Sequence, residues 1–183
     1  MKLYGKIKSK QGFSIGELLV ATLILLMVSS VVAGGIPVAR DAYLKVTIGA
    51  NSQVYLSTAI TELRNELGTA SNVKKSGNDI VYISGNTGSI SKLSNETDGI
   101  TITEYSFDPL NPDPAKAVES GKVLRTRVLV PKSPAPDNLY VSFTLKDVSD
   151  GVVEFEELTV KRDSDSKTYA EQKPLKIRSI GKQ

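Results

Sequence analysis

The chain of 183 residues contains no cysteine, no histidine and no tryptophan. Without cysteine there is no disulfide and no thiol chemistry, although exported proteins can also lack cysteine. Without histidine, Ser-His-Asp, Cys-His and histidine-based metal sites are excluded. Enzymes built on carboxylates or lysine remain open, but no such constellation and no Gly-rich phosphate loop is visible. The sequence therefore predicts a protein that is not an enzyme, with no catalytic residue, no cofactor and no metal site.

Acidic residues are absent from the first twelve positions, which hold Lys2, Lys6, Lys8 and Lys10. In the rest of the chain 19 basic residues face 20 acidic ones. The basic pI of about 9.0 therefore comes from this leader. Because the remainder has no overall positive charge to attract phosphates, we predict no direct nucleic-acid binding.

Charged residues are also absent from 18–39, LLVATLILLMVSSVVAGGIPVA. As a helix, these 22 residues span about 33 Å, enough to cross a hydrocarbon core of about 30 Å. The lysines before the segment predict a cytoplasmic N-terminus and an exported bulk. A secretory signal peptide cut near Ala33 is one alternative, but its apolar core is normally shorter. A plain signal anchor is another, and it explains the length but not Glu17.

Glu17 lies at the start of the apolar run, where a carboxylate is costly and usually has a partner and a function. It ends the stretch GFSIGE, 12–17, which follows the Lys-rich leader. This stretch resembles the processing site of type IV prepilins and type II secretion pseudopilins. Gly16 departs from the bulky aliphatic residue usual before the glutamate, and serine replaces the commoner threonine two residues earlier.

The resemblance implies that a prepilin peptidase cleaves between Gly12 and Phe13 and that Phe13 becomes N-methylated. Glu17 is then the fifth residue of the mature chain, where the family keeps its glutamate. Cleavage creates a cationic amine on Phe13, with an ordinary pKa near 7.7–8.0. A carboxylate on a neighbouring subunit would neutralise it in an apolar filament core, so Glu17 is interpreted as an assembly residue.

Gly34, Gly35 and Pro37 predict a helix break, because proline removes a helix hydrogen bond and glycine loosens the helix. The segment either ends there or bends and melts there, as pilins that resemble this chain often do. We therefore place the leader at 1–12 and the transmembrane or filament-core helix at 13–37.

A helical pattern resumes over 38–68 and predicts an amphipathic second half of the helix. Its apolar stripe of Leu56, Ile60, Leu63 and Leu67 is expected to pack on a sheet. Gly68 is the expected stop. The polar residues of the last two turns are placed on the other side of the helix: Glu62, Arg64, Asn65 and Glu66.

Short runs rich in β-branched and aromatic residues follow, separated by turn signals. A helix followed by strands indicates an α+β fold, a long N-terminal helix packed on an antiparallel β-sheet, which resembles the pilin plan. The globular β domain is placed at 69–183, and the tail 173–183 is either a last strand or frayed. The predicted strands are 79–84, 89–93, 99–107, 123–130, 139–146 and 152–161.

Two proline-rich stretches, 108–121 and 131–138, are interpreted as exposed connections, with a partner-binding surface as the alternative. Asp108, Asn111 and Asp113 also suggest a cation site, but their spacing is not that of an EF-hand, and such residues beside prolines commonly form turns. The segment 164–167 is interpreted as a solvated turn.

These patterns together predict a structural subunit of a type IV pilus or pseudopilus, located in the cytoplasmic membrane and then in an extracellular filament. In the family that this chain resembles, many major pilins close a C-terminal loop with a disulfide, which this chain cannot form; this favours a minor subunit or a lineage without the bridge. By the same resemblance, Glu17 argues against the tip-type subunits that lack that glutamate. The expected partners are the prepilin peptidase, other pilin or pseudopilin subunits, the assembly platform and, before assembly, membrane lipid. The alternatives are a membrane-anchored extracellular binding module that does not polymerise and an enzyme secreted after cleavage near Ala33.

Overall fold

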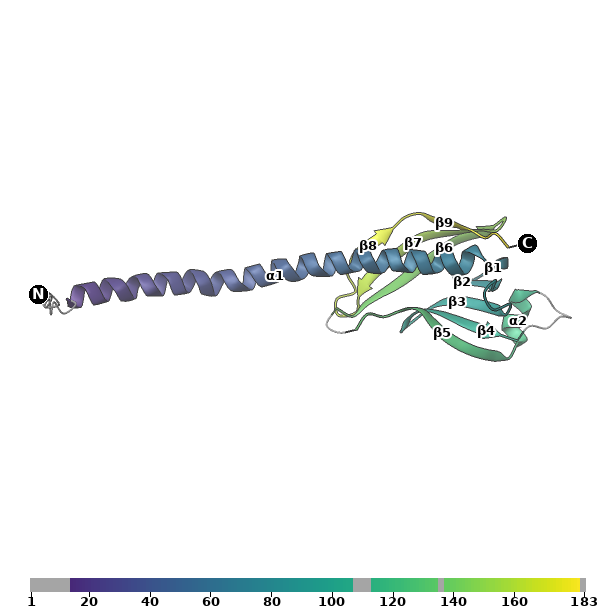
Figure 1. Ribbon diagram of the computed structural model, residues 1–183, viewed down its shortest axis with the longest axis horizontal. Coiled ribbons are helices and arrows are strands. Elements are labelled where there is room, and N and C mark those ends of the chain that lie inside the picture. The colour runs from purple at the N-terminus through teal and green to yellow at the C-terminus, as the bar shows by residue number, and fades with distance from the viewer. Residues whose placement is uncertain (1–13, 107–112, 135–136, 182–183) are drawn as a thin grey trace, which may run out of the picture. The chain divides into compact units, whose positions relative to one another are not determined.

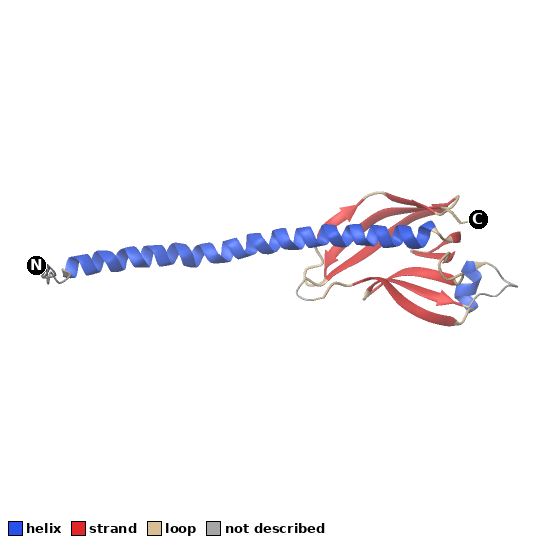
Figure 2. Cartoon of the chain, in the orientation of Figure 1, coloured by secondary structure: helices blue, strands red, loops and turns tan. Residues whose placement is uncertain are grey.

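The computed structural model describes residues 14–106, 113–134 and 137–181. One long helix comes first and every strand follows it (Figure 2). The chain divides into two compact units, 1–46 and 47–183, and helix α1 (Ile15–Gly68) runs from the first into the second. This organisation confirms the predicted α+β class and the helix stop at Gly68.

A helix end at Gly34, Gly35 and Pro37 is wrong for this structure, because α1 continues through all three, whereas melting of the helix there in a filament stays a prediction. Proline removes only one backbone hydrogen bond, and its ring meets the turn that precedes it. That turn contains the two glycines, and even a Cβ added at either one would meet no atom within 4 Å, so the space beside the turn is open. A helix with unbroken bonding on both sides of the proline therefore survives.

The strands of the second unit form two antiparallel sheets rather than one (Figure 1). The first sheet has the order β1-β2-β3-β4-β5, with a short helix, α2, packed against β1, β2 and β3. The second has the order β6-β7-β8, with β9 also paired to β7. The bounds are β1 Ser71–Ser76, β2 Asp79–Ile83, β3 Ile90–Glu96, β4 Gly99–Tyr105, α2 Pro114–Ser120, β5 Val123–Pro131, β6 Leu139–Ser149, β7 Val152–Arg162, β8 Thr168–Gln172 and β9 Leu175–Arg178.

The main core lies between the second part of α1 and both sheets. Leu56, Leu63 and Leu67 of the predicted stripe are buried there, and Ile60 packs against them partly buried. On β6, the alternate residues Val141, Phe143 and Leu145 point into the core, as expected of a strand with one buried face. Other buried core residues on the strands are Ile80, Tyr82, Leu93, Ile102, Phe155, Leu158 and Val160.

The hairpin between β6 and β7 follows the predicted turn chemistry. Asp150 and Gly151 form a two-residue loop, since Ser149 pairs directly with Val152. Both loop residues have positive φ, 50° and 71°, which matches the twist of antiparallel strands and is typical of an Asp-Gly pair.

The outer edge of β6 is covered by asparagine side chains from the first sheet. Asn95 donates to the carbonyl of Phe143 at 2.8 Å and accepts from its N–H at 3.0 Å. Asn78 accepts from the N–H of Leu145 at 3.0 Å. Lys75 donates to the carbonyl of Lys146 at 2.7 Å. These contacts provide hydrogen-bond partners for N–H and C=O groups of β6 that would otherwise be unpaired at the edge of the second sheet.

Two predictions about the connections need correction. The stretch 108–121 is not only an exposed connection, because α2 forms within it and buries Ala117. Asp113 caps this helix by accepting from the N–H of Ala115, and Pro114 follows at a position where proline suits a helix start. Sequence analysis also missed β1 and β8, while the tail holds β9 and 164–167 forms part of a turn.

Candidate functional site

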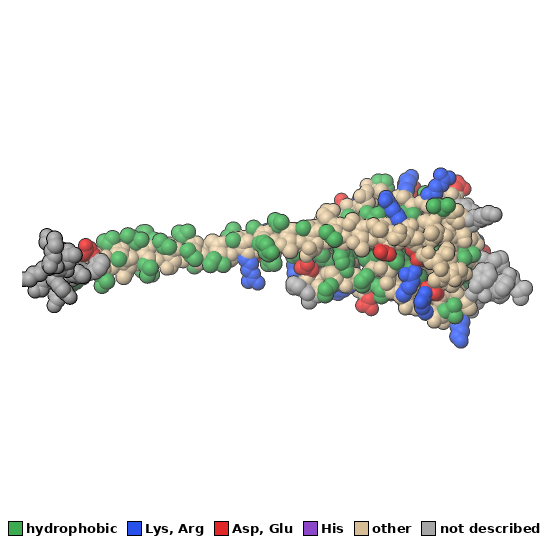
Figure 3. All heavy atoms as spheres, viewed as in Figure 1, with side chains coloured by type: hydrophobic (Ala, Val, Ile, Leu, Met, Phe, Trp, Pro, Cys, Tyr) green, Lys and Arg blue, Asp and Glu red, His purple; other side chains and the backbone are tan. Residues whose placement is uncertain are grey.

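The first part of α1 exposes apolar side chains throughout (Figure 3). Every described residue of 14–46 is exposed. A continuous exposed apolar surface indicates a site that is covered by a membrane or by another protein. Its largest apolar members are Ile15, Leu18, Leu19, Val20, Leu23, Ile24, Leu25, Leu26, Met27, Val28, Val31, Val32, Ile36 and Val38.

By length and composition, α1 is the one helix within the described ranges that is apolar enough to cross a membrane. None of its most apolar window is buried inside the protein. A core helix of a globular protein would be mostly covered by its own chain, so the exposure agrees with membrane anchoring.

Glu17 and Ser14 form a reciprocal capping box at the start of α1. The backbone N–H of Ser14 donates to Glu17 Oε2 at 3.0 Å, and the backbone N–H of Glu17 donates to Ser14 Oγ at 3.2 Å. The pattern S-x-x-E satisfies two N–H groups that a helix start leaves without partners. This capping role of Glu17 comes in addition to the assembly role predicted from its charge. Gly12 and Phe13 lie outside the described residues.

A second polar site lies in the globular unit, and its centre is Glu66 of α1. This residue is only 3% exposed, although the sequence pattern places it on the side of the helix away from the apolar stripe. Its Oε1 accepts from Tyr82 at 3.1 Å and Ser84 at 2.9 Å. Its Oε2 accepts from Asn86 at 3.2 Å and Arg127 at 2.8 Å. Four donors from β2, β5 and the connection after β2 thus join the end of α1 to the first sheet.

Arg127 extends this network to a second buried carboxylate, Glu104 of β4. Arg127 Nε lies 3.5 Å from Glu104 Oε1, and Arg125 binds the same oxygen through Nε at 3.2 Å and Nη2 at 2.8 Å. The hydrogen bond from Arg125 holds the pKa of Glu104 below its ordinary value, although burial opposes it. Burial, and then the charge of Glu66, raises the pKa of Tyr82 well above 10.

The arrangement around Glu66 is suited to holding structure together rather than to catalysis. Each of its carboxylate oxygens already accepts two hydrogen bonds, so neither has a lone pair free for a substrate. Among the described residues, no three acidic, cysteine or histidine side chains are grouped to hold a metal ion. Asp113 is engaged with Lys74 at 2.9 Å as well as with its helix, and Asp108 and Asn111 fall outside the described part of the chain.

The fold and the exposed half of α1 define this chain as an α+β protein with one candidate membrane-spanning helix. No protein-family model matches it, and comparison with curated proteins and with solved structures yields no match.

Proposed function

We propose that this protein is a minor structural subunit of a type IV pilus or pseudopilus. The observation that carries the proposal is the fully exposed, charge-free apolar helix of 18–39 with Glu17 at its start and a basic leader before it. The leader ends in Gly12, and Phe13 follows it, as expected at a prepilin cleavage site.

The proposed assembly depends on what covers the exposed apolar side chains of α1. Burying apolar surface stabilises by about 25 cal/mol per Å², so the helix needs either lipid or other helices around it. Before assembly lipid surrounds it, with the N-terminus cytoplasmic and the globular unit outside. In the filament the same surface is covered by the helices of neighbouring subunits, and the assembly platform moves the subunit between the two environments.

Glu17 has the capacity for a contact between subunits as well as for its capping box. Its Oε2 accepts from Ser14, whereas Oε1 has no hydrogen-bond donor among the described residues. After cleavage by the prepilin peptidase, the cationic amine of Phe13 on the next subunit would bind this oxygen. Each incoming subunit would thereby be held at the register at which amine and carboxylate meet.

The first experiment determines the N-terminus by intact-mass and peptide analysis of protein from native membranes and from sheared surface material. A chain that begins at methylated Phe13 supports the proposal. A chain that still begins at Met1 contradicts it in favour of an anchored module that does not polymerise, and a start near Gly34 indicates a secreted protein.

The capping box makes a sharper second experiment available. Glu17→Gln keeps a side-chain acceptor for the Ser14 N–H but removes the charge, whereas Glu17→Ala removes both. If charge pairing drives assembly, both variants are lost from sheared filaments while the precursor still accumulates in the membrane. Normal incorporation of Glu17→Gln would show that Glu17 acts only as a helix cap.

A further inference from the structure

The exposed part of α1 is longer than a membrane core requires. Residues 15–46 form about 48 Å of helix, whereas the hydrocarbon core is about 30 Å thick. The charge-free run accounts for about 33 Å of this length, so 40–46 continue for about 10 Å beyond it. The headgroup layers bring the full bilayer to about 40–45 Å, so 40–46 fall at the depth of one headgroup layer.

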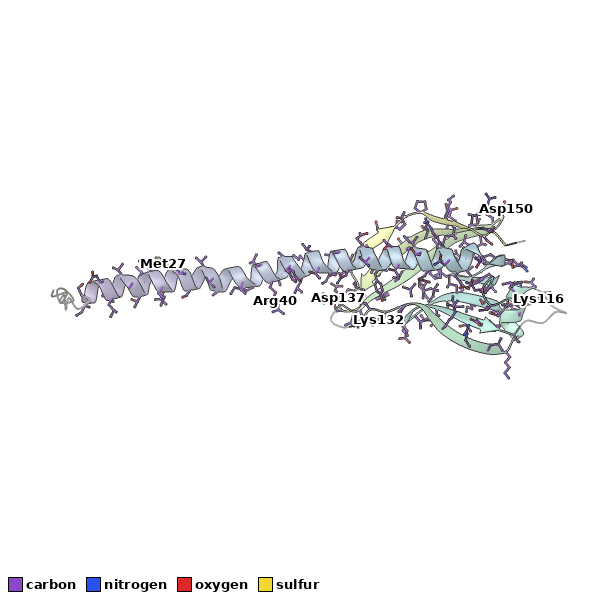
Figure 4. All side chains as sticks on the ribbon, in the orientation of Figure 1. Met27, Arg40, Lys116, Lys132, Asp137 and Asp150 are labelled. Atoms are coloured by element: carbon purple, nitrogen blue, oxygen red, sulfur yellow. The ribbon has the colours of Figure 1, made fainter. Side chains whose placement is uncertain are left out.

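This short segment combines apolar side chains with two cationic residues, Arg40 and Lys45, and one acidic residue, Asp41. Tyr43 is 69% exposed and Val46 is 72% exposed, and Leu44 is also open to its surroundings. Arg40, the first charge after the run, extends away from the helix axis (Figure 4). Tyrosine at this depth and arginine whose stem lies along apolar surface are both typical of a membrane interface.

Arg40 and Lys45, the two cations of the segment, differ in the residues that lie one helical turn away from them. One helical turn away on either side it meets only Ile36, Pro37, Tyr43 and Leu44. Among the described residues it forms no ion pair. Lys45 instead lies four residues after Asp41, the spacing at which a carboxylate and an ammonium group on one helix face attract each other. The segment therefore presents the Arg40 guanidinium with no acidic residue one helical turn away and with Tyr43 three residues after it.

We infer that Arg40, with Tyr43 and Leu44, forms a binding site for the headgroup of an anionic phospholipid. The inference rests on the membrane insertion in the proposed function. The guanidinium binds phosphate oxygens through paired N–H donors, and the tyrosine and leucine lie at the boundary with the acyl chains. The charge of the site selects lipid over a second copy of this chain, because the same surface of a second copy would bring two guanidinium groups together. Headgroup binding then fixes the depth of α1 before assembly.

Local lipid enrichment tests this inference directly. The chain has no cysteine, so the full-length variant Ala42→Cys carries a fluorophore at one exposed position inside the segment. The protein is reconstituted in phosphatidylcholine vesicles with a minor fraction of phosphatidylglycerol. Either lipid carries a nitroxide near its headgroup, and the ratio of the two quenching efficiencies measures enrichment beside residue 42. The start of α1 at Ile15 lies about 40 Å along the helix from residue 42, farther than the thickness of the hydrocarbon core.

We expect phosphatidylglycerol to be enriched about fivefold, as one cation at a membrane surface contributes about 1 kcal/mol. Arg40→Gln should abolish the enrichment, Arg40→Lys should keep most of it, and the matched control Lys45→Gln should leave it nearly unchanged. Equal effects of Arg40→Gln and Lys45→Gln, or no effect of Arg40→Gln, would overturn the site. If neither lipid quenches the label, membrane insertion fails and the proposed function fails with it. If phosphatidylglycerol is not enriched although the protein in filaments starts at Phe13, headgroup binding is refuted and the proposed function stands.

Discussion

Replacing Glu66 with alanine should destabilise the globular unit by about 3 kcal/mol. Removal of one partner from a buried ion pair costs about 3–5 kcal/mol, because the other charge stays behind without compensation. Here the lower end applies, since the Arg127 side chain is 33% exposed and keeps Glu104 at 3.5 Å. Tyr82, Ser84 and Asn86 also lose their common acceptor.

Glu66→Gln should cost less, about 2 kcal/mol. Its single amide oxygen accepts at most two of the four donors, and its NH₂ group faces donors that it cannot bind. In the double variant with Arg127→Ala, the costs should not add, with a coupling of about 1–3 kcal/mol.

The assay is urea unfolding of the full chain in detergent micelles, followed by near-ultraviolet circular dichroism of the seven tyrosines. Glu62→Ala is the control, because Glu62 precedes Glu66 by one turn of α1 and is only partly buried. Its cost should stay below about 0.5 kcal/mol. The reasoning fails if Glu66→Ala is as mild as this control, or if its cost simply adds to that of Arg127→Ala.

Two further predictions concern the same unit. Because the folded-state pKa of Tyr82 lies well above 10, stability from its protonated form is present below pH 10 and is lost as pH rises from there toward the folded pKa. Tyr82→Phe should lose about 1–2 kcal/mol at neutral pH but show a flatter decline above pH 10 in the same urea assay, and an unchanged decline would exclude Tyr82 as the titrating group. Asn95→Ala should cost about 1–3 kcal/mol and increase self-association in sedimentation, because it uncovers the backbone edge at Phe143. Asn51→Ala, which loses only an exposed contact to Asp137, is the control and should change neither.

Much of the strand pattern could be predicted because alternation and turn residues act over a few neighbouring positions. Val141, Phe143 and Leu145 alternate on β6, and the Asp150-Gly151 turn needs only its own positive φ angles. β1 was missed because its sequence SNVKKS has little β-branched character and depends on its pairing with β2. α2 was missed because the prolines around it suggested a loop, although Asp113-Pro114 is a legitimate helix start.

The two candidate sites also differ in how far they could be predicted from the sequence. The apolar run, the basic leader and Glu17 are contiguous, and the capping box could have been found from the spacing of Ser14 and Glu17. Glu66 could not, because its burial depends on residues 16 to 61 positions away in sequence. The nearest available signal was that Arg125 and Arg127 share one face of a strand with period two.

The sequence by itself determined that α1 is a helix with a membrane-length apolar run, because that property depends on composition and local periodicity. It also determined the α+β class, since the helix precedes a series of short strands. Only the tertiary structure decided that the strands divide into two sheets, that asparagine side chains cover the edge of β6, and that α1 continues through Pro37. It also decided that Glu66 is buried, because a carboxylate is stable inside a protein only where distant donors converge on it.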